Sequence, residues 1–328
     1  MTYKTESTDW LIIGGGIHGT HIAIRLMTEA QVPRNQICIL DPAERLLSRW
    51  LKVTALTGMT HLRSSSVHHL DTEPQSLRLF ARKHFPPETQ PFSKPYDRPS
   101  LKLFNAHSDW LIKEYDLASI HLQDKAMEFM ELNQNGITIK TKGNKVISAA
   151  KAILAIGIGD QPEWPDWARA GKRKIQHLFD ADFQWPQTTE SIIIVGGGIT
   201  AAQAALQMKN RQVHLVSRHG FRLHQFDSDP GWFGPKHLPE FLNEKNPVVR
   251  RRIIRNARYR GSMPPEVHQA LVKAIDDGKI QYHTAQIEGV EESDNSISIT
   301  TVENQTISAE HLVLATGFSP RVPGGAMV

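Results

Sequence analysis

Two short stretches of this chain follow the same plan. Residues 9–20 read DWLIIGGGIHGT, and residues 191–202 read SIIIVGGGITAA. In each, a run of apolar residues leads into a glycine-rich turn and then into a segment with helical periodicity. A turn of this kind after a parallel strand places backbone N–H groups and a helix N-terminus against a pyrophosphate. The sequence therefore predicts an α/β chain with two dinucleotide-binding units.

Each unit needs a strand before its turn, a helix after it and a second strand beyond. We expect these elements over residues 10–13, 16–30 and 37–40 in the first unit, and over residues 192–195, up to about 210, and 213–216 in the second. In the first turn, Gly14 makes the bend, Gly16 lets the phosphate approach, and Gly19 lets helix and strand pack closely. Gly196, Gly198 and Ala201 hold the matching positions of the second turn.

The ends of the second strands distinguish the two nucleotides. Asp41 stands where a carboxylate accepts hydrogen bonds from a ribose and repels a 2′-phosphate, so the first site suits FAD or NAD. Ser217 and Arg218 stand at the equivalent place in the second site, where a hydroxyl and a guanidinium suit the 2′-phosphate of NADPH. The alternative for Arg218 is an ordinary surface arginine. A flavin held at one site and reduced by NADPH at the other would require two dinucleotide sites in one chain.

The segments outside the two units have less specific patterns. We expect a proline-rich loop over residues 84–100, an amphipathic helix over 101–115 and a hairpin over 136–149. Two further strands are expected over 280–290 and 297–302, and a linker over 162–186. AILAIG (152–157) and LVLATG (312–317) form a second internal echo, because each is an apolar strand that follows a hairpin and ends in glycine. The basic run 245–260 has seven cationic residues and no acidic one, and it fits the solvated face of a helix or a surface that attracts NADPH.

Composition narrows the class of protein. The 328 residues carry a formal charge of +4, too small to indicate a nucleic-acid partner. The N-terminus is polar and no run of 18 apolar residues occurs, so we expect neither a secretory signal nor a membrane span. Cys38 is the single cysteine and fits a small buried hydrophobe in a reducing, cytoplasmic setting. His68 and His69 lack the further ligands of a zinc site, so we expect no metal.

These motifs give the chain a resemblance to the two-dinucleotide-domain flavoproteins. Among them it is most similar to the single-component flavin monooxygenases, which include flavin-containing monooxygenases and lysine and ornithine N-hydroxylases. The resemblance rests on GGGIHG with Asp41, GGGITA with Ser217 and Arg218, AILAIG, and LVLATGF. It implies two Rossmann-like, three-layer domains joined by β-hairpin crossovers. It implies an FAD domain from residues 1–165 and 306–328, with an NADPH domain inserted over residues 166–305.

Shorter matches carry the resemblance to the flavin ring. Ser48-Arg49-Trp50 and MTHLRS (59–64) look like segments beside the flavin, and Arg98-Pro99-Ser100 like the entry to a helix. His177 resembles the end of a family fingerprint, although its spacing from Gly171 is longer than usual. The turns and the resemblance together assign to FAD residues Gly14, Gly16, Ile17, His18, Gly19, Asp41, Arg49, Trp50, Leu62, Arg63 and Gly157, and to NADPH residues Gly196, Gly198, Ile199, Thr200, Ser217, Arg218, Thr316 and Gly317.

The resemblance also implies a reaction. NADPH reduces FAD, the reduced flavin forms a C4a-hydroperoxide with oxygen, and one oxygen atom passes to a small soft nucleophile such as an amine. Arg63 is the candidate catalytic residue because it is expected near the flavin. Two alternatives stay open, an NADPH oxidoreductase or oxidase without oxygen transfer and a non-catalytic nucleotide-binding relative. A disulfide reductase of the kind that needs a cysteine pair is excluded by the single cysteine.

The C-terminus departs from the family pattern. The chain ends at Val328, whereas the resemblance implies a further segment after Gly317 that touches the flavin. A naturally short protein, a fragment, and a pocket completed by a partner chain all fit this departure. The chain could act alone or as a homo-oligomer on a small-molecule substrate.

Overall fold

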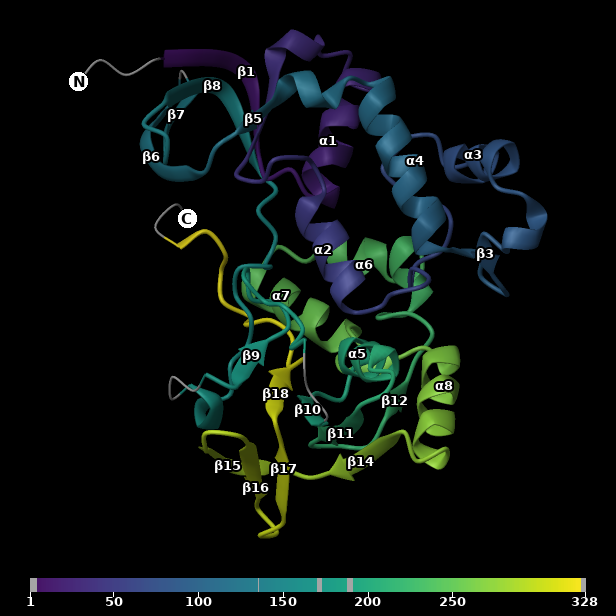
Figure 1. The fold of residues 1–328 in the computed structure, drawn as a ribbon. Coiled ribbons are helices and arrows are strands. Elements are labelled where there is room, and N and C mark those ends of the chain that lie inside the picture. The colour runs from purple at the N-terminus through teal and green to yellow at the C-terminus, as the bar shows by residue number, and fades with distance from the viewer. Residues whose placement is uncertain (1–4, 135, 170–172, 188–190, 326–328) are drawn as a thin grey trace. The chain divides into compact units, whose positions relative to one another are not determined.

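The computed structural model describes residues 5–134, 136–169, 173–187 and 191–325. The chain divides into two compact units (Figure 1). The first comprises residues 1–55, 59–161 and 318–328, and the second comprises residues 56–58 and 162–317. Each unit contains one α/β sheet with a parallel set of strands and one of the glycine-rich turns. The predicted fold class, two dinucleotide-binding α/β units, is confirmed.

The first unit is built on a six-stranded sheet in the order β5-β2-β1-β8-β7-β6. Its strands are β1 (Thr5–Ile13), β2 (Ile37–Asp41), β5 (His121–Gln123), β6 (Ala126–Asn133), β7 (Gly136–Thr141) and β8 (Val146–Leu154). β5, β2, β1 and β8 run parallel, while β7 and β6 continue the sheet as an antiparallel extension. The predicted hairpin at residues 136–149 is therefore β7 and β8, and β8 extends beside β1 as far as the first AILAIG echo.

Helices α1 (Ile17–Thr28) and α4 (Leu101–Glu114) of the first unit bury apolar residues against this sheet, and α3 (Ser76–His84) packs on α4 in a separate cluster. The unit also contains α2 (Ser48–Leu56), the short helices η1 (Arg34–Gln36), η2 (Pro87–Thr89) and η3 (Leu117–Ile120) and the hairpin β3 (Phe92–Ser93) and β4 (Arg98–Pro99). Ile12 and Ile39 of the sheet share one core cluster with Ile24 of α1 and Leu111 of α4. The predicted helix after the proline-rich loop is α4, and the Ser100 hydroxyl caps it by accepting from the Leu103 amide at 3.2 Å.

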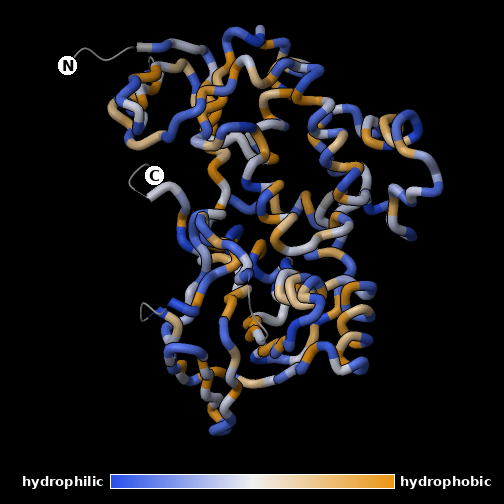
Figure 2. Tube along the Cα trace, viewed as in Figure 1, coloured by the Kyte–Doolittle hydropathy of each residue, from blue (hydrophilic) through white to orange (hydrophobic). Residues whose placement is uncertain are grey.

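The second unit is built on a five-stranded parallel sheet in the order β14-β11-β10-β18-β9. Its strands are β9 (Ile175–His177), β10 (Ser191–Val195), β11 (Gln212–Ser217), β14 (Ile280–Thr284) and β18 (His311–Leu314). After a polar first residue, β10 and β18 are continuous runs of buried apolar residues (Figure 2), as strands covered on both faces should be. A second, antiparallel sheet of β15 (Ile287–Glu292), β16 (Ile297–Thr301) and β17 (Thr306–Ala309) shares a core cluster with them.

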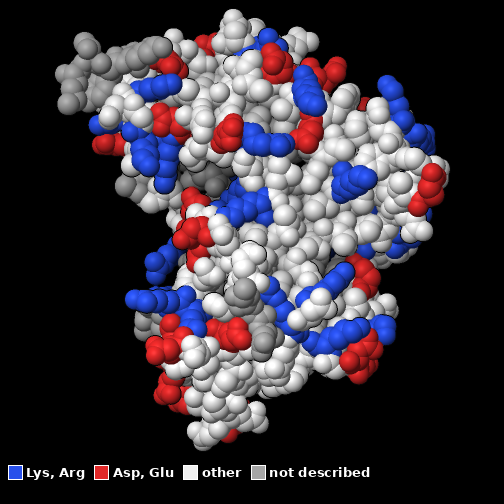
Figure 3. Space-filling view, viewed as in Figure 1, with Lys and Arg blue, Asp and Glu red and all other residues white. Residues whose placement is uncertain are grey.

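The remaining elements of the second unit are mostly helical. They are α5 (Ile199–Gln207), α6 (Leu238–Asn243), α7 (Pro247–Ala257) and α8 (Pro265–Asp276), the short helices η4 (Asp166–Ala168) and η5 (Pro230–Phe233), and the strand pair β12 (Arg222–Leu223) and β13 (Ser262–Met263). α7 covers residues 247–257 of the basic run 245–260, which continues beyond the helix, and it has no buried residue. On the face shown in Figure 3, cationic and anionic side chains are interspersed. No helix within the described residues is long and apolar enough to cross a membrane.

The structure corrects three details of the predicted organisation. The run 280–290 is two strands in two different sheets, because the chain leaves the parallel sheet after Thr284. The predicted linker 162–186 contains β9, the edge strand of the parallel sheet. The return to the first unit was expected at residue 306, but β17 and β18 pair within the second unit, which extends to Gly317. Gly171 lies outside the described residues.

Candidate cofactor sites

The first glycine turn is built so that side chains are excluded. Gly14 has φ +113°, and a Cβ there would lie 2.5 Å from the carbonyl oxygen of Ala155, at the end of β8. A Cβ on Gly19 would lie 1.8 Å from the carbonyl oxygen of Gly14. Both contacts are far inside van der Waals distance and involve backbone atoms, which cannot move aside cheaply. Glycine at these two positions therefore lets α1 pack directly on the turn.

Gly16 differs from these two because it faces open space. A Cβ at this position would meet nothing within 4 Å, although its backbone is ordinary, with φ −77°. Gly16 is the N-cap of α1, and no side chain in the described residues caps that helix. The amide groups of Ile17 and His18 thus begin a helix with an uncapped, open N-terminus, which fits the pyrophosphate of a dinucleotide.

Asp41 lies beside the same turn, at the end of β2. Its Oδ2 accepts from the Gly15 amide at 2.6 Å, and its Oδ1 accepts from the Ala43 amide at 2.9 Å. Each carboxylate oxygen keeps a further lone pair that can accept from a ribose hydroxyl. The structure therefore brings Gly14, Gly16 and Asp41 together in an arrangement that fits the adenosine half of FAD.

The segments predicted beside the flavin ring make separate contacts. The Arg49 guanidinium donates to the Gly159 carbonyl and lies 3.5 Å from Asp160, so α2 is tied to the loop that follows Gly157. Trp50 is engaged with α4, because its Nε1 donates to Asn105 Oδ1 at 2.9 Å. The indole of Trp50 therefore joins α2 to α4, and the sequence did not indicate this contact.

Leu62 and Arg63 belong to a third set of contacts. Leu62 is buried, its amide donates to the Pro99 carbonyl at 2.9 Å, and its carbonyl accepts from Arg98 Nη1 at 3.1 Å. Arg63 follows directly and is half-buried. The buried Arg98 guanidinium thus fixes the backbone of this segment against β4.

The second turn repeats the geometry of the first. Gly196 has φ +156°, and its Cβ would lie 2.6 Å from the carbonyl oxygen of Ala315, at the end of β18. Ala315 therefore corresponds to Ala155, and the two sequence echoes have the same structural role. Gly198 is the N-cap of α5, which no side chain in the described part of the chain caps, and Ile199 and Thr200 form its first turn. This open helix start also fits a pyrophosphate.

Ser217 lies beside the second turn, because a Cβ placed on Gly197 would meet its Oγ. Its side chain is 2% exposed, and its hydroxyl donates to the His219 carbonyl at 2.8 Å, which closes the loop after β11. Arg218 is exposed, and none of the described acidic residues forms an ion pair with it, so its guanidinium is available for a 2′-phosphate.

A buried histidine joins the two segments that enter and leave the second unit. His177 Nδ1 accepts from the Phe179 amide at 3.1 Å, which leaves its proton on Nε2, 3.1 Å from Thr316 Oγ1. The Thr316 hydroxyl donates to the Glu163 carbonyl, whose amide in turn donates to the Gly317 carbonyl at 2.9 Å. Burial lowers the pKa of His177 to about 4, so the ring is neutral near pH 7. Thr316 and Gly317 are thus fixed by the protein itself.

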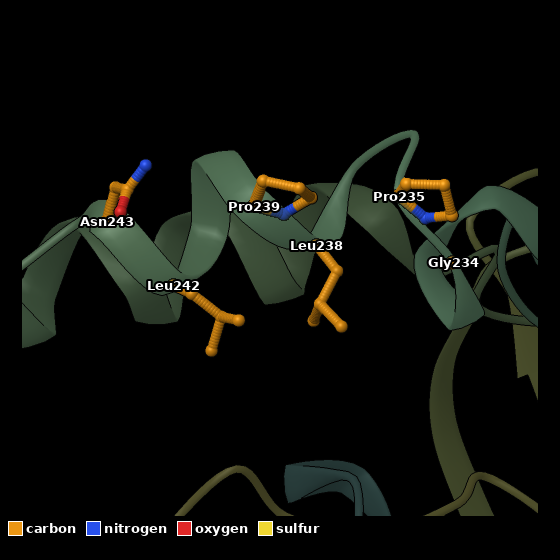
Figure 4. Close-up of a pocket in the computed structure, with 6 residues that line it drawn as sticks. All are labelled: Gly234, Pro235, Leu238, Pro239, Leu242 and Asn243. Atoms are coloured by element: carbon orange, nitrogen blue, oxygen red, sulfur yellow. The ribbon is translucent and has the colours of Figure 1, made fainter.

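A groove of about 500 Å³ lies elsewhere in the second unit. Figure 4 shows that Leu238 and Leu242 of α6 project from one side of the helix into it. It is also lined by Gly234, Pro235, Pro239 and Asn243, and it contains none of the predicted cofactor residues. Among the described residues, no group of three or more His, Cys, Asp or Glu is arranged to hold a metal ion.

Comparison with known proteins gives one family match. The family model described as pyridine nucleotide-disulphide oxidoreductase matches residues 8–325. We found no match among curated proteins.

Solved structures with the same fold include two ornithine hydroxylases. The reduced form of the enzyme from Pseudomonas aeruginosa has a TM-score of 0.75 at 17% identity, covering 98% of this chain and 84% of the hydroxylase. The ornithine N-hydroxylase from Kutzneria sp. 744, with reduced FAD, NADP⁺ and L-ornithine, has a TM-score of 0.76 at 15% identity, covering 98% and 83%. A bacillithiol disulfide reductase from Staphylococcus aureus has a TM-score of 0.61 at 17% identity, covering 96% and 78%. At these identities the likeness establishes the fold.

Proposed function

This chain belongs to the pyridine nucleotide-disulphide oxidoreductase family, and we propose that it is an FAD- and NADPH-dependent monooxygenase acting on a small soft nucleophile such as an amine. The observation that carries the proposal is the pair of matched turns with different strand ends. Asp41 anchors the end of β2 beside the first turn, and the exposed Arg218 follows β11 beside the second. The first unit would then hold FAD and the second would hold NADPH.

Two further observations favour oxygenation over disulfide reduction. Cys38 is the chain's single cysteine, and burial, with the nearby Glu6 carboxylate, raises the pKa of its thiol to about 11. A thiol of this kind is a poor nucleophile near pH 7. The two ornithine hydroxylases also have higher TM-scores than the disulfide reductase.

The residues of the chain would bind and orient, and bound FAD and NADPH would supply the redox chemistry. The uncapped starts of α1 and α5 would each receive a pyrophosphate, and Asp41 would accept from the ribose of FAD. The neutral His177, through Thr316, would hold the segment before Gly317 in place. Arg63 is the residue we propose nearest the reacting atoms.

The test is an absorption spectrum of the purified protein, followed by anaerobic addition of NADPH. We expect flavin bands that bleach with NADPH, and then oxygenated product when oxygen and an amine are supplied. A peroxide yield that matches NADPH consumption without product would point to an oxidase. Protein that is colourless and does not take up added FAD would contradict the proposal.

Arg218→Ala is expected to weaken NADPH binding about 10- to 100-fold and to leave NADH binding nearly unchanged, because a charge-assisted bond to a phosphate contributes about 1.5–3 kcal/mol. The measurement is the dissociation constant of each nucleotide for the FAD-loaded protein. Arg252→Ala removes the same charge from the exposed face of α7 and serves as the control. An equal loss for both nucleotides would remove Arg218 from the 2′-phosphate site.

A further inference from the structure

The loop Arg258–Ser262 lies directly against the second glycine turn. A Cβ placed on Gly198, the N-cap of α5, would be 3.3 Å from the Cα of Gly261. Gly261 in turn lies beside the His219 ring, whose Nε2 is 3.4 Å from the position of a Gly261 Cβ. Residues more than sixty positions apart in the sequence therefore meet at the start of α5, where the pyrophosphate of a bound dinucleotide is expected.

The backbone of this loop is fixed by its pairing with the segment after β11. Arg222 of β12 is aligned with Ser262 of β13, and the His224 amide donates to the Met263 carbonyl at 3.1 Å. The Arg222 guanidinium also donates to the carbonyl of Arg260 at 3.3 Å. The loop is thus held at both the strand pair and its tip.

The side chains on either side of Arg260 are already engaged within the protein. Arg258 forms an ion pair with Asp227 at 3.0 Å. Tyr259 stacks on His224, with ring centroids 3.7 Å apart and planes 11° from parallel. Ser262 is buried, and its hydroxyl donates to the Tyr259 carbonyl. These contacts position the loop and leave Arg260 as the cation at its tip.

Arg260 has the properties of a phosphate ligand that its neighbours lack. Its side chain is exposed, and no acidic residue in the described ranges pairs with it. Its Cα is about 3.8 Å from that of Gly261, the residue that abuts Gly198. We propose that Arg260 binds the pyrophosphate of the nicotinamide nucleotide at the second turn. The inference rests on the proposed function, because it takes that turn as the nucleotide site.

The proposed role differs from that of Arg218 in a measurable way. A 2′-phosphate is present in NADP⁺ and absent from NAD⁺, whereas both nucleotides have the pyrophosphate. A guanidinium that contacts the pyrophosphate should therefore contribute equally to both, with the α5 amides as its partners on the other side. Arg218 would thus select NADP⁺ over NAD⁺, and Arg260 would raise the affinity for both nucleotides.

The experiment is calorimetric titration of FAD-loaded protein with NADP⁺ and with NAD⁺, which reads binding without turnover. For Arg260→Ala we expect both dissociation constants to rise by the same factor, about tenfold or more, as for loss of one charge-assisted contact. Arg260→Lys, which keeps a point charge without the planar fork, should recover part of the affinity. Arg252→Ala should bind both nucleotides as the wild type does.

Two results would overturn the inference. Wild-type affinity of Arg260→Ala for both nucleotides would show that Arg260 does not touch them, and loss for NADP⁺ alone would place it at the 2′-phosphate. In either case the wild type still binds NADP⁺ and the proposed function stands. A wild-type protein that binds neither nucleotide would instead contradict both the proposed function and the inference.

Discussion

Protein carrying Gly14→Val is expected to be purified without flavin. The valine Cβ would lie 2.5 Å from the Ala155 carbonyl oxygen, and φ +113° is unfavourable for a β-branched residue. The turn would have to move away from β8, and the first amides of α1 would lose their common direction. We expect FAD affinity to fall at least tenfold, or by more than about 1.4 kcal/mol. The measurement is the ratio of flavin to protein after gel filtration with excess FAD.

Because Gly14→Val also strains the fold, Gly16→Ala is the cleaner companion variant. Its φ of −77° suits alanine, and its Cβ would meet nothing within 4 Å, so the unfolding transition should stay as in the wild type. The new methyl would protrude where the pyrophosphate is expected, so flavin retention should still fall. Gly289→Ala, also in open space but in β15, is the control. Full flavin content in Gly16→Ala would show that FAD does not bind at this turn.

The two turns were predictable because their requirements are local. Gly14 and Gly19 are needed where backbone atoms come within 3 Å of a side-chain position, and such constraints leave glycine in the sequence. The alternation between buried strand and amphipathic helix is also a local pattern. The sequence therefore predicts the strands and helices beside each turn to within a few residues, apart from the start of β1 at Thr5.

What could not be predicted depends on contacts between distant segments. The indole of Trp50 donates to Asn105, which lies 55 residues further along the chain, and no local pattern indicates that contact. The change from one sheet to the other after Thr284 cannot be predicted from periodicity, because the residues on both sides of it alternate as strand residues do. In the sequence, Arg260 is only the end of a basic run, and its place beside the second turn depends on the approach of Gly261 to Gly198.

The protein is expected to lose stability steeply as the pH falls from about 6.5 to about 4, because of two buried histidines. Burial lowers the pKa of His177 to about 4, and burial with the neighbouring His69 lowers that of His107 to about 4. Both lie below the ordinary value of 6.5, so the unfolded chain binds protons that the folded chain does not. The stabilisation is therefore complete above about pH 6.5 and is lost towards pH 4, by about 3 kcal/mol for each ring.

Glutamine variants test this dependence in each unit, since His107 lies in the first unit and His177 in the second. The His107 ring bonds to Ser76 Oγ at 2.9 Å, and that of His177 to Thr316, so both variants should be less stable near neutral pH by about 1–3 kcal/mol. Each should nevertheless show a shallower pH dependence in the unfolding of its own unit, because glutamine does not titrate. The measurement is denaturant unfolding at several pH values, with the exposed His84→Gln as the control. If stability depends on pH as steeply in the variants as in the wild type, the two rings have the same pKa in the folded and unfolded chain. The loss of stability in acid would then have to come from the carboxylates.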